Sequence, residues 1–227
     1  PKRIVQKEEK RILSKADKVI YVSPFTLEKQ IGMFPSISDK FHFLPIPYIK
    51  QTSVQNKELK EFDLGYFGDF YSRDRNIQPL YSVAEKYNFS LKICGNSDVP
   101  IKCNSKIKVS PRINYDLVKK YEGESEILVC ICNTNGTQLP GKIYHYAAST
   151  KPILVILDGE RSMHIKEYLE KFDRYIICFN TEESIKEAIN SIKNSNKEYD
   201  PSPFFAPIRI AKGILEYAYP NIKDKVR

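Results

Sequence analysis

The fold of this chain is decided by residues 133–152, which read NTNGTQLPGKIYHYAASTKP. An apolar run at 127–132 precedes this stretch and a second run at 152–157 follows it. Each run has the length and composition of a strand that is buried on both faces of a sheet. Pro140 marks a helix start between them, because its fixed φ suits a first helical turn and its missing N–H is not needed there. The pattern is therefore strand, helix, strand.

The predicted helix start is a candidate anion site. The N–H groups of Gly141, Lys142 and Ile143 would be free there, at the positive end of the helix dipole. The side chain of Lys142 adds a full charge, and the combination favours a phosphate. The alternative is an ordinary crossover in which Lys142 is only solvated. The stretch alone does not separate these two interpretations.

The composition is that of a soluble globular protein with a basic surface. Of 227 residues, 41% are hydrophobic, and 36 Lys and Arg against 28 Asp and Glu give a net charge of +8. Such a surface suits nucleic acid, an anionic bilayer or a phosphorylated small molecule. No aromatic-interleaved RNA-binding motif occurs, so we expect no nucleic-acid partner. Peripheral contact with an anionic membrane stays open.

The cysteines and histidines favour a cytoplasmic protein without a metal. Five cysteines are present, an odd number, and the spacing of Cys130 and Cys132 suits neither a redox pair nor a zinc site. The three histidines lie far from any ligand pattern. No apolar run approaches the roughly 20 residues of a membrane span, and we expect no signal peptide. We predict reduced thiols in a core and no bound metal, with peripheral membrane attachment left open.

From residue 62 onward, short apolar runs alternate with helical patterns. Six runs have the character of buried strands, namely 62–67, 90–94, 106–109, 127–132, 152–157 and 175–179. Strands of this kind, separated mostly by helices, form a parallel sheet covered on both faces. Right-handed crossovers then give a doubly wound, Rossmann-like α/β domain.

Three regions are expected along the chain. Residues 1–50 are too few for a core of their own and lead into a polar, Pro-containing boundary. Residues 51–200 form the Rossmann-like domain. Residues 201–227 are a Pro-rich linker followed by a final helix. Because the sequence begins with Pro1 rather than Met, we expect a piece of a longer protein.

Ligands of doubly wound sheets bind beyond the carboxyl ends of the strands, near the switch in strand order. Residues 68–75, GDFYSRDR, follow the first strand. Gly68 would let a ligand or backbone approach closely, and Arg73 and Arg75 could form bidentate hydrogen bonds with a diphosphate. By itself this loop favours a solvated turn closed by Arg73 and Asp74. Together with Lys142, however, two loops offer cations to one crevice, which favours phosphate binding.

Two further positions are candidates for contact with a nucleoside. Ser110-Pro111-Arg112 follows another strand and could pack against a nucleobase, although a turn explains these residues equally well. His145 stands one helical turn after Lys142 and could hydrogen-bond a ribose or act on a sugar. A structural or solvated His145 is the alternative, and both interpretations stay open.

Several segments resemble the GT-B nucleotide-sugar glycosyltransferases. Residues 139–154, LPGKIYHYAASTKPIL, resemble the family segment Leu-Pro-x-Lys-x-x-Glu-Tyr-x-Ala-x-Gly-x-Pro-Ile. Residues 62–68, FDLGYFG, look like the opening strand of the family's C-terminal domain, and 91–95, LKICG, look like its second strand. Residues 16–23 and 40–48 are similar to the end of the N-terminal domain and the interdomain linker. The likeness covers nearly the whole chain in order.

The resemblance implies the C-terminal, donor-binding half of a GT-B enzyme of the group 1, family 4 type. Residues 1–50 would then be the end of the N-terminal, acceptor domain and the linker, with most of that domain missing. The implied reaction moves a sugar from a nucleoside-diphosphate sugar to a glycan or lipid-linked acceptor. Such enzymes need no metal and no cofactor beyond the donor. Amides at a helix start and cations stabilise the departing nucleoside diphosphate.

Carried over residue by residue, the resemblance assigns roles to the candidates. Those facing the diphosphate would be Gly68, Gly141 and Lys142, with Arg73 or Arg75 as a further cation. His145 would meet the ribose of the nucleoside, while Ser110 and Arg112 stay nucleoside candidates by their position after a strand alone. His145 and Lys142 would be the catalytic pair.

The sequence departs from the family pattern at three positions. His145 stands where the family usually has the glutamate that holds the ribose, and Thr137 stands where a second glutamate is common. Thr150 replaces a usual glycine. Two alternatives therefore stay open: a sugar-nucleotide epimerase of the same fold, and a non-catalytic, degenerate nucleotide-binding domain.

Overall fold

The computed structural model describes residues 2–49 and 60–219, and the chain divides into two compact units. The smaller unit comprises residues 1–49, 137–139 and 203–227, and the larger one comprises residues 50–136 and 140–202. Every candidate residue named above lies in the larger unit except Thr137.

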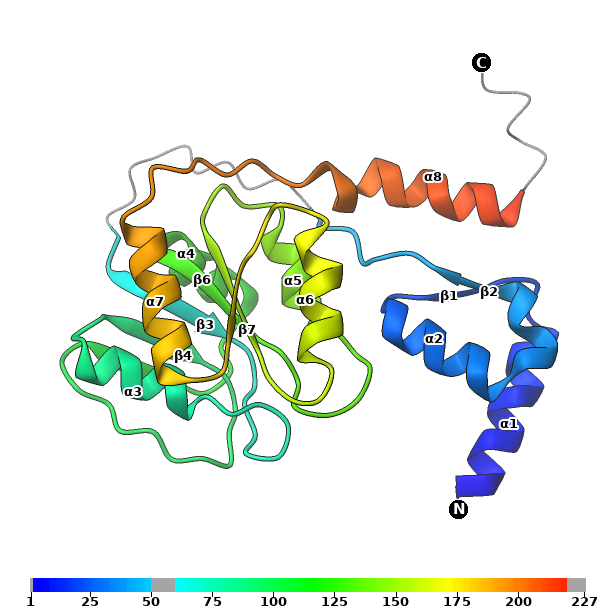
Figure 1. Ribbon diagram of the computed structural model, residues 1–227, viewed down its shortest axis with the longest axis horizontal. Helices are drawn as coiled ribbons and strands as arrows, with labels where there is room; N and C mark the ends of the chain where they lie inside the picture. Colours follow the sequence, from blue (N-terminus) through cyan, green and yellow to red (C-terminus); the bar gives the residue numbers. More distant parts are fainter. Residues whose placement is uncertain (1, 50–59, 220–227) are drawn as a thin grey trace. The chain divides into compact units, whose positions relative to one another are not determined.

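The described residues of the larger unit form one six-stranded parallel sheet (Figure 1). Its strands are β3 (Phe62–Phe67), β4 (Leu91–Cys94), β5 (Ile107–Ser110), β6 (Ser125–Ile131), β7 (Ile153–Leu157) and β8 (Ile176–Phe179). Their order across the sheet is β5-β4-β3-β6-β7-β8, and each neighbouring pair is parallel. The prediction of a doubly wound, Rossmann-like α/β domain is therefore confirmed.

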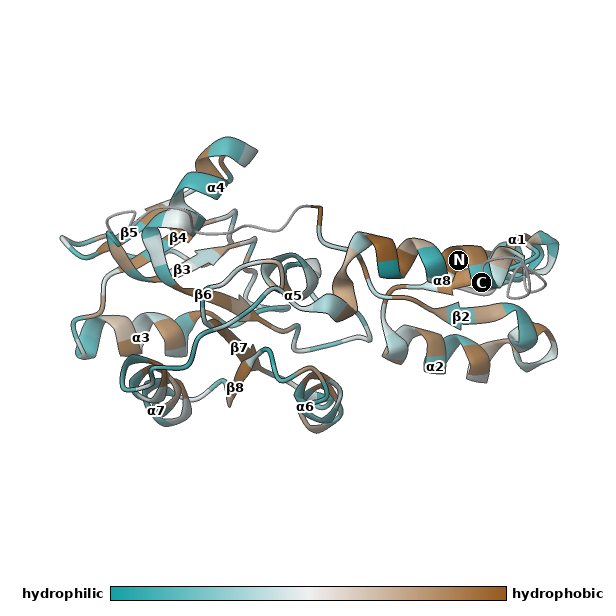
Figure 2. Ribbon diagram, turned by 90° about the horizontal axis from the view of Figure 1, so that it is seen from above, coloured by the Kyte–Doolittle hydropathy of each residue, from teal (hydrophilic) through white to brown (hydrophobic). Residues whose placement is uncertain are grey.

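Helices cover both faces of this sheet. They are α3 (Gln78–Lys86), α4 (Tyr115–Glu124), α5 (Gly141–Tyr146), α6 (Ser162–Glu170) and α7 (Glu182–Lys193). Seen from above, α3 and α7 lie on one side of the strands, and α4, α5 and α6 lie on the other (Figure 2). All five residues of β7 are buried, as a central strand with helices on both faces requires.

The direction of the crossovers reverses between β3 and β6. From β3 the chain moves through α3 to β4 and then β5, and it returns through α4 to β6 on the other side of β3. The loops that leave the carboxyl ends of β3 and β6 therefore diverge. This is the switch point at which doubly wound sheets bind their ligands.

The smaller unit combines both ends of the chain. Its elements are α1 (Lys2–Lys15), β1 (Val19–Tyr21), α2 (Pro24–Met33), β2 (Phe41–Phe43) and α8 (Pro207–Ala218), with short 3-10 segments at Pro35–Lys40 and Pro203–Phe205. β1 and β2 form a two-stranded parallel sheet. The Tyr217 ring of α8 stacks on His42 with centroids 4.1 Å apart, and a Cβ added at Gly213 would come within 2.8 Å of Leu44 Cδ2. The C-terminal helix thus supplies packing that the first 49 residues lack.

The cysteines are free thiols, in line with the prediction of reduced side chains. Cys94, Cys130, Cys132 and Cys178 are buried, whereas Cys103 is exposed and lies outside the predicted core. Burial raises the pKa of the Cys130 thiol to about 12. This thiol therefore stays protonated and unreactive at neutral pH.

Candidate functional site

Two loops meet at the switch point, one after β3 and one after β6. Arg75, in the first loop, donates from Nε to the side-chain oxygen of Asn133 in the second, at 2.7 Å. The backbone N–H of Thr134 donates to the carbonyl of Asp74 at 2.8 Å, and the Thr134 hydroxyl donates to the same oxygen at 3.3 Å. These hydrogen bonds join the loops, so both loops together position Arg75.

Among the described residues, Arg75 forms no ion pair with a carboxylate at the switch point, although its charge helps to lower the pKa of the Asp69 carboxyl group. Besides its bond to Asn133, its Nη1 donates to the backbone carbonyl of Asp69 at 3.1 Å. Both acceptors are neutral, and Arg75 forms no ion pair with any residue that the structure describes. A fixed guanidinium with no carboxylate in contact is the arrangement that a diphosphate would complete.

The other two predicted residues of the β3 loop are placed differently. The Arg73 side chain is 89% exposed and lies 3.7 Å from the Asp74 carboxylate, which matches the solvated turn. A Cβ added at Gly68 would meet nothing closer than the Tyr66 hydroxyl at 3.5 Å, an ordinary contact. The close approach is instead at Gly95, where an added Cβ would lie 1.9 Å from the Gly68 carbonyl oxygen. Glycine is therefore required at Gly95 rather than at Gly68.

Two of the predicted nucleoside contacts, Ser110 and Arg112, lie at the carboxyl end of β5, and both are already engaged. The guanidinium of Arg112 pairs with the Asp69 carboxylate, and its backbone N–H donates to Asn96 at 3.2 Å. The Ser110 hydroxyl donates to the Cys94 sulfur at 3.2 Å. Burial alone would raise the pKa of Asp69, but hydrogen bonds from the Asn96 backbone and Arg112 hold it below its usual value. Arg112 is thus anchored, with 69% of its side chain still exposed.

The Lys142 ammonium lies against a buried carboxylate of α4. Its Nζ is 2.8 Å from Glu122 Oε1, and Lys119 Nζ is 2.8 Å from the other oxygen of the same carboxylate. Only 8% of the Glu122 side chain is exposed, whereas 34% of the Lys142 side chain is. Lys142 also lies over the Tyr146 ring, 5.1 Å from its centroid. Its charge is therefore compensated in this structure, which neither of the two sequence interpretations anticipated.

The helix start differs from the prediction in two respects. α5 begins at Gly141, and Pro140 is its N-cap residue rather than part of its first turn. The backbone N–H of Ile143 donates to the Pro140 carbonyl at 3.0 Å, so the expectation that it would be free is wrong. The N–H groups of Gly141 and Lys142 donate to no residue that the structure describes. Because α5 has only six residues, the side chains rather than the helix dipole dominate the local charge.

His145 is half-buried in the same neighbourhood. Burial lowers the pKa of its imidazole below the usual value, and the charges of Lys142 and Lys119 lower it further, against an opposing effect of Glu122. The ring is therefore neutral at physiological pH. A neutral imidazole can both donate and accept a hydrogen bond, which suits contact with a hydroxyl group.

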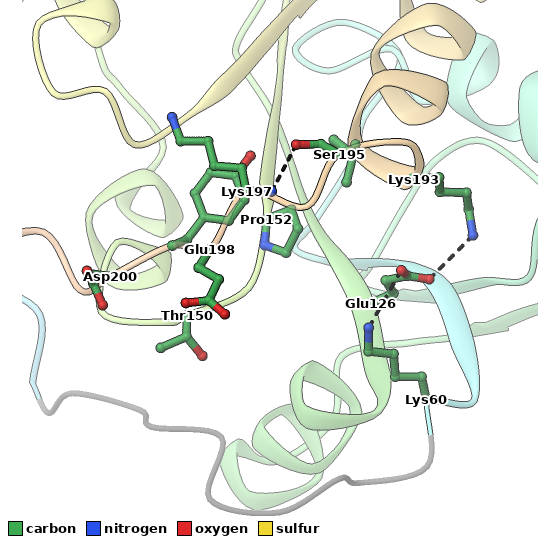
Figure 3. Close-up of a pocket in the computed structure, with 11 residues that line it drawn as sticks. Lys60, Glu126, Thr150, Pro152, Lys193, Ser195, Lys197, Glu198 and Asp200 are labelled. Atoms are coloured by element: carbon green, nitrogen blue, oxygen red, sulfur yellow. Dashed lines mark hydrogen bonds and ion pairs between the residues drawn. The ribbon is translucent and has the colours of Figure 1, made fainter.

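The two threonine departures lie elsewhere. Thr137 belongs to the smaller unit, where its carbonyl accepts from the Ser23 hydroxyl at 2.6 Å and from the Thr26 hydroxyl at 3.1 Å. Thr150 precedes β7 and lines a pocket of about 410 Å³ at the amino ends of the strands (Figure 3).

This pocket is a less suitable ligand site than the switch point. Its walls carry both signs of charge, and Glu126 already pairs with Lys60 at 3.6 Å and with Lys193 at 3.3 Å. Lys60 lies two residues before β3 and Pro152 lies directly before β7, which places the pocket at the sheet edge opposite the carboxyl ends. Parallel doubly wound sheets bind their ligands at the carboxyl ends.

Two kinds of feature are not found among the described residues. No group of three His, Cys, Asp or Glu side chains is arranged to hold a metal ion. None of the described helices is long and apolar enough to cross a lipid bilayer.

Solved structures share this fold, although no protein-family model and no curated protein matches the sequence. A structure titled "lipopolysaccharide outer core galactosyltransferase WaaB apo form" aligns with a TM-score of 0.59 and 13% identity over 90% of this chain and 62% of its own. Sucrose-phosphate synthase from Thermosynechococcus elongatus aligns with a TM-score of 0.60 and 14% identity, over 97% of this chain and 62% of its own. A glycosyltransferase from Rickettsia africae ESF-5 aligns with a TM-score of 0.53 and 14% identity, over 93% of this chain and 65% of its own.

The chain has a GT-B glycosyltransferase fold. The resemblance of its segments to the GT-B enzymes is thereby confirmed at the level of the fold, since identities of 13% and 14% establish no more. The chain spans less than two thirds of the length of these proteins, at 62% to 65%. Within the GT-B fold, the six-stranded unit is the Rossmann-like domain.

Three residues that position the candidates of this GT-B domain were not identified from the sequence. They are Asp69, Asn133 and Glu122, which hold Arg112, Arg75 and Lys142 respectively. Asp69 and Asn133 lie within the stretches 68–75 and 133–152, each two residues after the end of a strand, so their place after a strand was the available signal. The sequence contains no comparable signal for Glu122, because a Glu three residues after a Lys on a helix is typical of an ordinary surface ion pair.

Proposed function

We propose that this chain is the donor-binding part of a glycosyltransferase that moves a sugar from a nucleoside-diphosphate sugar to a glycan or lipid-linked acceptor. The observation that carries the proposal is Arg75, a guanidinium fixed by both loops of the switch point and lacking a carboxylate partner among the described residues. The GT-B fold also supports a glycosyltransferase function, since two structures that match the chain are titled as glycosyltransferases.

The chemistry follows from where charge develops. When the bond between sugar and diphosphate breaks, negative charge accumulates on the leaving nucleoside diphosphate, and fixed cations stabilise it most in the transition state. Arg75 is available for this role directly, and Lys142 can contribute once its ammonium leaves Glu122. His145, being neutral, would hydrogen-bond a hydroxyl of the ribose or sugar. No metal is needed in this scheme.

We also propose that the protein works in the cytoplasm without a nucleic-acid partner and touches an anionic membrane peripherally. The distribution of charge supports the membrane contact. The smaller unit has 14 Lys and Arg against 7 Asp and Glu, whereas the larger unit has 22 against 21. The excess positive charge of the chain therefore resides almost wholly in the smaller unit, which would face the bilayer.

Calorimetric titration of the chain with UDP and with GDP tests donor binding. We expect Arg75→Ala to weaken binding by at least about tenfold, the usual loss for a charged hydrogen-bonded contact. Arg73→Ala, the same change two residues away at an exposed position, should change it less than about twofold. The proposal fails if neither nucleotide binds, or if the two variants behave alike.

A second measurement separates transfer from the alternatives. A degenerate, non-catalytic domain is favoured by the missing carboxylates at Thr137 and His145. The chain in its full-length protein should release nucleoside diphosphate from a sugar nucleotide only when an acceptor is present. Formation of an epimer without acceptor would identify an epimerase instead, and binding without any product would identify the non-catalytic domain.

A further inference from the structure

Glu122 has an unusual number of cationic partners for a buried carboxylate. Each of its oxygens lies 2.8 Å from a different ammonium, Lys142 on α5 and Lys119 one turn earlier on α4. Both lysines leave roughly a third of their side chains exposed, 34% for Lys142 and 38% for Lys119, whereas Glu122 is almost fully enclosed. The lysines can therefore move, and the carboxylate cannot follow them.

Because Glu122 has two lysine partners, the free-energy cost of losing one of them is lower than it would be for a single ion pair. A buried carboxylate that loses its sole partner is strongly destabilising, so a single lysine would be locked in place. With Lys119 at the second oxygen, Glu122 keeps one ion pair when Lys142 departs. Lys119 is fixed on the same helix as Glu122, so it remains in reach throughout.

Lys142 has a second anion within reach if the proposed function is right. It is the second residue of α5, and α5 starts just after the loop that leaves the carboxyl end of β6. Its flexible stem allows the ammonium to turn from α4 towards this edge of the sheet. The edge is the one at which Arg75 is held.

We propose that Glu122 and Lys119 form a latch for Lys142. Lys142 leaves Glu122 to contact the donor diphosphate, and Lys119 keeps the buried carboxylate paired while it does so. The inference rests on the proposed function, because it needs a diphosphate at the switch point. It adds that Lys119, a positioning residue that touches no ligand, controls donor affinity.

The test is a set of UDP titrations by calorimetry at fixed pH and salt. Lys119→Met removes the second partner, so Lys142 becomes locked and UDP affinity should fall about tenfold, whereas Lys119→Arg should retain it. Lys120→Met is the matched control: Lys120 neighbours Lys119 on α4, is 62% exposed and pairs with Glu124 at 3.6 Å. It should change affinity less than about twofold.

The Glu122→Gln variant distinguishes the latch from a simple long-range attraction between the Lys119 charge and the diphosphate. Without the carboxylate, Lys142 is free, so UDP affinity should equal or exceed that of the wild type. In this background Lys119→Met should have no further effect. The latch is overturned if Lys119→Met weakens binding equally with and without Glu122, which would indicate long-range attraction. It is also overturned if Glu122→Gln weakens binding as much as Lys142→Met does.

Failure of the proposed function gives a different result. If the wild type binds neither UDP nor GDP, the donor site itself is wrong and the latch falls with it. If the wild type binds UDP and Lys142→Met binds it equally well, the donor site stands and the latch is wrong. Circular dichroism of each variant, with Lys119→Arg as the conservative change, confirms that affinities are compared between folded proteins.

Discussion

Gly95→Ala should damage both stability and the candidate site. The new Cβ would lie 1.9 Å from the carbonyl oxygen of Gly68, 2.5 Å from its carbonyl carbon and 3.0 Å from the Asp69 nitrogen. All three atoms are backbone, and ordinary contact begins near 3.4 Å, so the β3 loop must move by about 1.5 Å. Overpacking of this kind costs about 1 to 3 kcal/mol.

The displaced segment includes the groups that position two candidate cations. The Asp69 carboxylate holds Arg112, and the Asp69 carbonyl accepts from Arg75. We therefore expect Gly95→Ala to lower the free energy of unfolding in urea by about 1 to 3 kcal/mol, and to weaken UDP binding. Gly68→Ala is the matched comparison, because its Cβ meets only ordinary contacts and should cost less than about 1 kcal/mol. Equal stability of the two variants would refute the steric argument.

Three further predictions concern the fold. Ile156→Ala removes a fully buried side chain from β7 and should cost about 2 to 5 kcal/mol in urea unfolding. Thr181→Ala removes the side-chain cap that accepts from the Ser184 N–H of α7 and should cost about 1 kcal/mol by the same assay. Burial alone would raise the pKa of Asp63, but hydrogen bonds from Lys193 and Ser90 lower it overall. A carboxyl with a lowered folded pKa stabilises the protein above its unfolded pKa, so this contribution should be lost as pH falls below about 4. The urea midpoint of Asp63→Asn should consequently fall less between pH 7 and pH 3 than that of the wild type.

The strands were predictable because the signal for each one is local. Apolar runs such as 62–67 and 152–157 need only their own residues to be recognised, and the structure shifts their limits by no more than two residues. The parallel order of the sheet followed from the alternation of strand and helix. The short α5 was less predictable, because the position of Pro140 relative to the first helical turn depends on the loop before it.

The partners of the candidate cations were not predictable in the same way. Arg75 meets Asn133 across 58 positions of sequence, and Lys142 meets Glu122 across 20. These contacts depend on the strand order, which places the loops after β3 and β6 side by side and α4 beside α5. Sequence patterns identify which residues carry charge near strand ends, but the fold decides which of those charges are already paired.

That difference determines how the site can bind a diphosphate. Sequence analysis offered four cations, at positions 73, 75, 112 and 142. The structure pairs Arg112 with Asp69, Lys142 with Glu122 and Arg73 with Asp74. Arg75 is left without an ion pair in the part of the chain that the structure describes. A nucleoside diphosphate carries more than one negative charge, so a single guanidinium compensates only part of it. The remaining negative charge of the bound diphosphate must then either stay solvated by water or be compensated by a cation that leaves an existing ion pair. Lys142 suits recruitment best, because its carboxylate keeps a second lysine when it leaves.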